Sequence, residues 1–150
     1  MTTKRVSWLW FSLTLLAFLG NGFAQVLAAD PEFEVQLIWG TNGEKPKGQQ
    51  LSDVDSKLKD KLASVFKWKN YFEVTKKEVV AKKNRPPKIK LSDKCDIEVR
   101  DAGNSTIEVK LYGEGKYERK VTKAFAPGEL IVLAGDAKNN TAWFVVLTPK

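Results

Sequence analysis

Residues 95–111 read CDIEVRDAGNSTIEVKL, two alternating runs joined by a short turn. Apolar residues alternate with charged ones from Cys95 to Arg100, and the pattern returns from Ile107 to Leu111. Successive side chains of a β-strand point to opposite faces, so each run forms one apolar and one polar face. Residues 102–105 (AGNS) have the composition of a turn. The stretch therefore predicts a β-hairpin with one buried face.

Further strand signals flank this hairpin on both sides. Residues 116–123 are weakly apolar and are predicted to form an edge strand, whereas 130–134 and 142–147 are continuously apolar, which indicates central strands covered on both faces. Prolines at 86 and 87 separate two upstream segments, because proline cannot donate to a strand ladder. The remaining predicted strands cover residues 33–39, 66–75 and 89–91.

One segment has helical periodicity. Apolar residues recur every three or four positions over 51–66, which is the spacing of one helix face. Ser52 followed by Asp55 resembles a capping box, and Lys67 and Lys69 suit the helix C-terminus. Short connections between strands favour antiparallel neighbours. The predicted fold is α+β, an antiparallel meander sheet of about six or seven strands with one amphipathic helix packed on it; the alternative is a partly open β-barrel capped by the helix.

The first 29 residues have the three-part order of a secretory signal peptide. Lys4 and Arg5 precede an apolar run over 6–19, and small residues lead to Ala28 and Ala29, where cleavage is expected. The alternative is an uncleaved anchor, but the apolar run is shorter than the roughly 20 residues that span a bilayer. The sequence thus predicts an exported protein, periplasmic or extracellular, with no stable transmembrane span after cleavage. Residues 30–150 form a single predicted domain.

The composition restricts both the cellular compartment expected for the protein and the chemistry that its side chains can perform. The chain has a single cysteine, so no intramolecular disulfide can form, and it has no histidine. This composition favours a bacterial envelope over a disulfide-rich eukaryotic secretory route. The absence of histidine excludes histidine-based catalysis and metal ligation. Cys95 lies in phase with the apolar face of its strand, which predicts a buried thiol. The sequence predicts no catalytic residue, cofactor or metal site, and an enzyme using carboxylates or a Ser/Lys pair is the least favoured class.

Charge is concentrated in residues 57–94, which carry 13 basic and four acidic residues. The aromatic and basic segment 66–72 either packs its rings in the core or presents them beside lysines for stacking and anion binding. Alternation favours core packing, although Tyr71 falls on the lysine side. The candidate residues for binding an anion or a partner are Lys67, Lys69, Tyr71, Lys76, Lys77, Lys82, Lys83, Arg85 and Lys88.

These observations favour an exported, non-enzymatic domain that acts as an interaction or binding module of the cell envelope. The expected partner is an envelope protein or an anionic wall or lipid component, and no nucleic acid is expected in that compartment. The alternative function is a polyanion or membrane-surface binder using residues 57–94. The sequence does not determine the oligomeric state.

Overall fold

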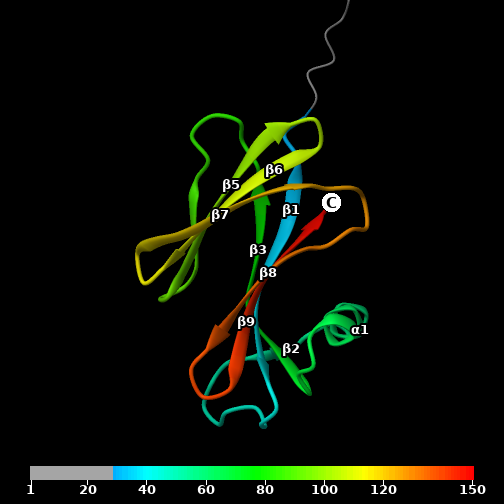
Figure 1. Cartoon of the computed structure of the whole chain (residues 1–150), viewed down its shortest axis with the longest axis vertical. Coiled ribbons are helices and arrows are strands. Elements are labelled where there is room, and N and C mark those ends of the chain that lie inside the picture. The colour runs from blue at the N-terminus through cyan, green and yellow to red at the C-terminus, as the bar shows by residue number, and fades with distance from the viewer. Residues whose placement is uncertain (1–28) are drawn as a thin grey trace, which may run out of the picture.

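The structure is a computed structural model and describes residues 29–150, so the predicted signal peptide lies outside the described residues except for Ala29. Nine strands and one helix follow in chain order (Figure 1). Their bounds are β1 (Glu32–Thr41), β2 (Ser52–Asp53), α1 (Ser56–Val65), β3 (Asn70–Val80), β4 (Lys88–Ser92), β5 (Cys95–Gly103), β6 (Thr106–Gly113), β7 (Lys116–Ala124), β8 (Ile131–Ala137) and β9 (Thr141–Pro149). No helix within residues 29–150 is long and apolar enough to cross a membrane.

The strands form two antiparallel sheets. One has five strands in the order β2-β3-β1-β9-β8, and the other has four in the order β4-β5-β6-β7. The predicted α+β class with antiparallel strands is confirmed, but the single meander of about six or seven strands is wrong, since only the four-stranded sheet is a meander. The reason is that β1 pairs with both β3 and β9, and such long-range pairing leaves no signal in local alternation.

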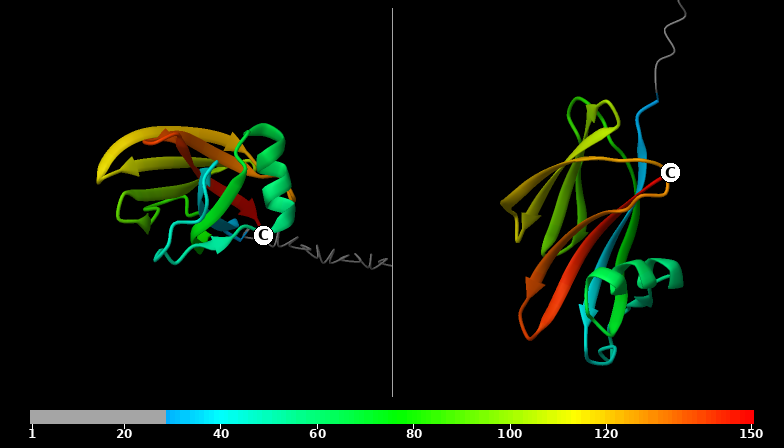
Figure 2. Two further views of the ribbon diagram at one scale, coloured as in Figure 1. Left: turned by 90° about the horizontal axis from the view of Figure 1, so that it is seen from below. Right: turned by 45° about the vertical axis from the view of Figure 1, so that its right-hand side comes forward.

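The main core lies between the two sheets. On β1, Phe33, Val35 and Leu37 face the four-stranded sheet, where they meet buried residues such as Val99 and Val109. The four-stranded sheet covers this face, and α1 lies on the opposite face of the five-stranded sheet (Figure 2). The alternative was a partly open barrel capped by the helix; the strands of residues 29–150 instead form two separate sheets with no closed barrel, and the helix packs on the outer face of one of them.

Helix α1 covers the outer face of the five-stranded sheet with a narrow apolar stripe. Leu58 and Leu62 are buried against Phe144 and its neighbours in a second core. The helix is shorter than predicted: Ser52 belongs to β2, and Asp55 is the N-cap, whose carboxylate accepts hydrogen bonds from two backbone N–H groups. Val65 is 69% exposed rather than buried, because only the middle of this short helix reaches the sheet.

The C-terminal strands were predicted partly correctly. Strand β9 is central and almost wholly buried, whereas β8 is an edge strand and not a central one. Its continuous apolar character has another cause: Ile131 and Leu133 enter the core between the sheets, while Val132 and Ala134 pack towards α1. The prediction that β7 is an edge strand is confirmed.

A cleft between the two sheets as the candidate functional site

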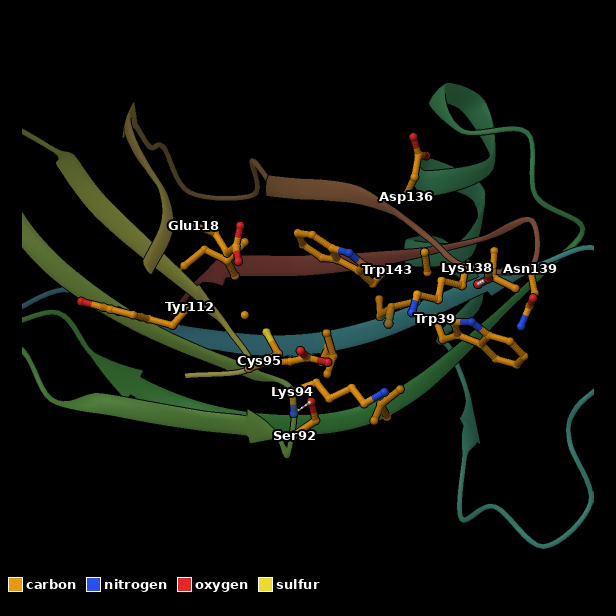
Figure 3. Close-up of a pocket in the computed structure, with 18 of the residues that line it drawn as sticks. Trp39, Ser92, Lys94, Cys95, Tyr112, Glu118, Asp136, Lys138, Asn139 and Trp143 are labelled. Carbon is orange, nitrogen blue, oxygen red and sulfur yellow. Dashed lines mark hydrogen bonds between the residues drawn. The ribbon is translucent and has the colours of Figure 1, made fainter. Parts of the chain in front are cut away.

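The two sheets diverge towards one end (Figure 1). A cleft of about 1090 Å³ lies between them there (Figure 3). Its walls are the inner faces of both sheets, and its mouth is bordered by the β4–β5, β6–β7 and β8–β9 turns and by the loop after β1. Leu37, Val74, Cys95 and Leu111 contribute apolar surface to its lining. The cleft is an extension of the main core that the two sheets leave open.

Two tryptophans line this cleft, Trp143 near its middle and Trp39 towards one end (Figure 3). Trp39 on β1 and Trp143 on β9 are directly opposite each other in the ladder, and both are half-buried. The Trp143 indole lies across Gly135 of β8, where an added Cβ would be only 2.2 Å from Cζ2 of the ring. The Arg119 guanidinium lies 5.6 Å from the Trp143 ring centroid and donates to the Ala134 carbonyl at 2.6 Å. These contacts position the Trp143 ring, whereas the Trp39 ring lies 6.1 Å from the Phe72 ring, centroid to centroid.

Charged side chains surround the aromatic pair. Lys94 and Lys138 extend over the cleft face of the five-stranded sheet, close to Trp39 (Figure 3). Glu118 lies on the other side of Trp143, and Asp136 points away from the cavity. Glu118 and Asp136 therefore do not face each other across the cleft as a catalytic pair would.

The single cysteine is poorly suited to nucleophilic catalysis. Burial and the nearby Asp96 carboxylate raise the pKa of the Cys95 thiol to about 11, so it stays protonated at neutral pH. Within residues 29–150 no group of three carboxylates or thiols is placed to hold a metal ion. The sequence prediction of a buried thiol is correct in part, because Cys95 is half-buried and borders the cleft.

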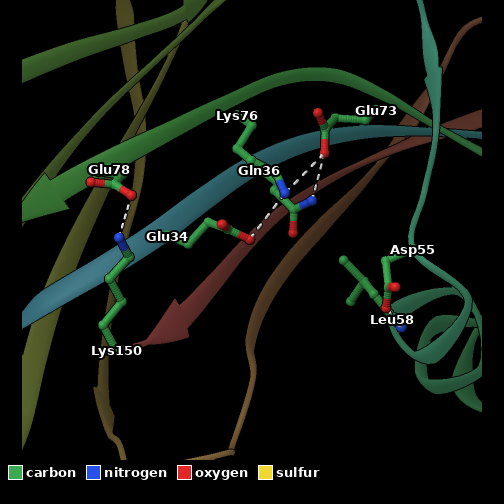
Figure 4. Close-up of polar contacts among 8 residues, drawn as sticks. All are labelled: Glu34, Gln36, Asp55, Leu58, Glu73, Lys76, Glu78 and Lys150. Atoms are coloured by element: carbon green, nitrogen blue, oxygen red, sulfur yellow. Dashed lines mark hydrogen bonds and ion pairs between the residues drawn. The ribbon is translucent and has the colours of Figure 1, made fainter.

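Several of the basic residues proposed from the sequence are neutralised by carboxylates. Lys76 Nζ lies 3.4 Å from Glu34 and 3.8 Å from Glu73 (Figure 4). Lys83 Nζ lies 4.0 Å from an oxygen of Asp101. Lys88 Nζ lies 3.6 Å from Asp96 and 4.0 Å from the centroid of the Tyr112 ring. These three lysines are exposed but balanced by neighbours.

The other proposed cations do not gather in one place. Lys67 and Lys69 precede β3, Lys77 lies within it, and Lys82 and Arg85 follow it. An 11-residue strand such as β3 is roughly 35 Å long, so the two ends of this set are far apart. Lys67 and Lys69 therefore lie far from Lys77, Lys82 and Arg85.

Tyr71 was predicted on the lysine side of the strand, but the structure buries its ring. Only 3% of the residue is exposed, and its hydroxyl donates to the Phe66 carbonyl at 2.6 Å. The alternation was misread because Trp68 lies outside the strand, which begins at Asn70. Both faces of β3 are covered at this end, so Tyr71 and Phe72 are buried on opposite sides.

The cleft was not found from the sequence. Trp39 and Trp143 each lie two residues from a strand end that adjoins a turn, but nothing local indicates that they pair. Only the β1–β9 ladder brings them together. Two tryptophans, each two residues from a strand end beside a turn, are the signal that could have marked them.

The chain matches no protein-family model, no curated protein and no solved structure. The side chains that line the cleft come from both sheets and from three turns, so the site depends on the complete fold.

Proposed function

We propose that this protein is an exported, non-enzymatic binding module of the bacterial envelope, and that its ligand occupies the cleft between the two sheets. The observation that carries the proposal is the half-buried Trp39–Trp143 pair inside a cavity of about 1090 Å³. Ligand sites are typically concave and mostly apolar, with a few polar groups that fix orientation. Export itself rests on the sequence of residues 1–29.

A binding role suits the cleft better than catalysis does. Its thiol is held protonated, and Glu118 and Asp136 lie on either side of Trp143 rather than as a facing pair. Aromatic residues in such a cleft contribute to binding by offering a large apolar area on stiff side chains. The arrangement supports recognition without bond rearrangement.

Binding of a polyanion through residues 57–94 remains the weaker alternative. Lys76, Lys83 and Lys88 already have carboxylate neighbours, and the remaining cations of the set are distributed along the length of β3. Exposed lysines at such separations act nearly independently at physiological ionic strength. Lys67 and Lys69 therefore do not share one surface with the basic residues at the other end of β3.

The proposal is tested by retention from a native bacterial envelope extract. Residues 30–150 are immobilised as wild type, as Trp39→Ala and as Tyr117→Ala. Tyr117 is 57% exposed on the four-stranded sheet outside the cleft, so it provides a matched aromatic control. Mass spectrometry identifies the proteins and extracted small molecules that each variant retains.

We expect wild type and Tyr117→Ala to retain one component near stoichiometrically. We expect Trp39→Ala to lose it. Equal retention by all three would place the binding site elsewhere. No retention by the wild type would contradict the proposal. Circular dichroism establishes that each variant is folded before the comparison.

A further inference from the structure

We infer that the cleft binds a single-chain amphipathic anion, a carboxylate head joined to an unbranched apolar tail as in a fatty acid. The inference rests on the proposed function, because it assigns a ligand class to the same cleft. Two features of the cleft support it: an apolar interior that continues into the core, and unpaired ammonium groups at its mouth.

The interior is suited to an apolar tail. Trp39 and Trp143 border the cleft near the strand ends, and Leu37 follows deeper on β1, opposite Leu111 of the four-stranded sheet. Val74, the extra residue of the bulge in β3, also lines this region. Burying methylene groups against such surface contributes about 0.8 kcal/mol each, which is roughly fourfold in affinity.

The mouth is suited to an anionic head. Lys94 comes from the β4–β5 turn of one sheet and Lys138 from the β8–β9 turn of the other, and both side chains extend over the cleft (Figure 3). Neither forms an ion pair within residues 29–150. Lysine stems lie along apolar surface while their ammonium groups donate to carboxylates. The two lysines can therefore bind one carboxylate at the mouth.

The backbone holds both lysines at the mouth. The Lys94 N–H donates to Ser92 Oγ at 3.2 Å, and its carbonyl accepts from the Glu114 N–H at 3.1 Å. The Lys138 carbonyl accepts from the Thr141 hydroxyl at 2.9 Å. Because the backbone of each turn is held by hydrogen bonds, only the lysine side chains need to be ordered when a ligand binds.

Three carboxylates, Glu114, Glu118 and Asp136, also line the cleft, but none of them is within ion-pair distance of Lys94 or Lys138 in the described part of the chain. Arg119 is engaged with the Ala134 carbonyl and the Trp143 ring. Glu118 lies against Gly113, with its Oε1 3.1 Å from the position of an added Cβ there, on the far side of Trp143 from the lysines. A head group between Lys94 and Lys138 is thus separated from this carboxylate by the indole.

The test is a titration of residues 30–150 with laurate below its micelle concentration, followed by calorimetry and tryptophan fluorescence. We expect one saturable site, with affinity falling about fourfold for each methylene removed from the acid. Dodecanol, which has the tail without the charge, is expected to bind at least threefold more weakly. Dodecyltrimethylammonium, with the opposite charge, is expected to compete poorly.

Charge variants locate the head group. Lys94→Gln and Lys138→Gln are each expected to weaken laurate binding threefold to tenfold, whereas Lys77→Gln, an exposed lysine outside the cleft, is expected to leave it unchanged. These substitutions lie at exposed positions and leave both cores intact. Equal binding by the lysine variants and wild type, or equal affinity for laurate and the cationic amphiphile, would overturn the inference.

The results distinguish an incorrect ligand class from an incorrect binding site. If laurate does not bind, while envelope material is still retained by wild type and lost from Trp39→Ala, the cleft is the binding site and the ligand class is wrong. If laurate binds equally to wild type and to Trp39→Ala, it does not occupy the cleft, and the inference fails.

Discussion

Replacing Gly135 by alanine is expected to destabilise the protein by displacing Trp143. The added Cβ would stand 2.2 Å from Cζ2, 2.5 Å from Cε2 and 2.9 Å from Nε1 of the indole. Carbon atoms in contact are normally about 3.5–4.0 Å apart. Because Gly135 and Trp143 are directly opposite in the β8–β9 ladder, the ring has to move into the cleft or the strands have to separate.

The magnitude follows from two opposing effects. Overpacking of this kind costs about 1–3 kcal/mol. Alanine also restricts the unfolded chain, which offsets about 0.4–1 kcal/mol of that cost. The free energy of unfolding of Gly135→Ala is therefore expected to be about 1–2 kcal/mol lower than that of wild type.

Urea unfolding followed by circular dichroism measures this difference. Gly43→Ala is the matched control, because the nearest atom to its added Cβ is Thr41 Oγ1 at 3.5 Å, an ordinary contact. The cause is isolated by repeating Gly135→Ala in a Trp143→Leu background, where the cost is expected to disappear. A Gly135→Ala protein as stable as wild type, or an equal loss in both backgrounds, would refute the reasoning.

Three further predictions concern the cap, an ion pair and the thiol. Asp55→Ala removes the N-cap of α1 and is expected to lower the free energy of unfolding by about 1 kcal/mol in urea titrations. The control Asp53→Ala lies outside the helix and is expected to change it by less than about 0.5 kcal/mol. Because hydrogen bonding to Arg100 lowers the pKa of Glu108 from its ordinary value of 4.5, wild type is expected to exceed Glu108→Gln in stability above that pH. That difference should disappear as the pH falls through the lowered folded-state pKa; a pH-independent difference would contradict the assignment. Because the pKa of Cys95 is raised to about 11, its thiol is expected to react with a thiol reagent at pH 8 about two orders of magnitude more slowly in the folded protein than in urea. Equal rates in the two states would contradict a protonated thiol in the folded protein.

Local elements were largely predictable from the sequence. Alternation over 95–111 identified β5 and β6, and the turn at 102–105 placed their hairpin close to its observed position. Helical spacing identified α1, although Ser52 was taken as its cap instead of Asp55. These successes share a cause, since each depends on contacts between residues close in the sequence.

The arrangement of the sheets was not predictable in the same way. The β1–β9 pairing joins Phe33 to Pro149, and it divides the strands into two sheets instead of one. The same pairing brings together Trp39 and Trp143, so the cleft was missed for the same reason. Basic residues were visible in the sequence, but their carboxylate neighbours come from other strands.

The pairing of β1 with β9 also imposes an order on folding. The β5–β6–β7 meander joins neighbours in the sequence and can form as soon as it is synthesised, whereas the five-stranded sheet lacks a central strand until Thr141–Pro149 is available. Closing such long loops slows folding because chain entropy is lost before the contacts form. Until β9 inserts, β1 lacks one of its two neighbouring strands and β8 has no partner in the sheet, so we expect the five-stranded sheet to be completed last.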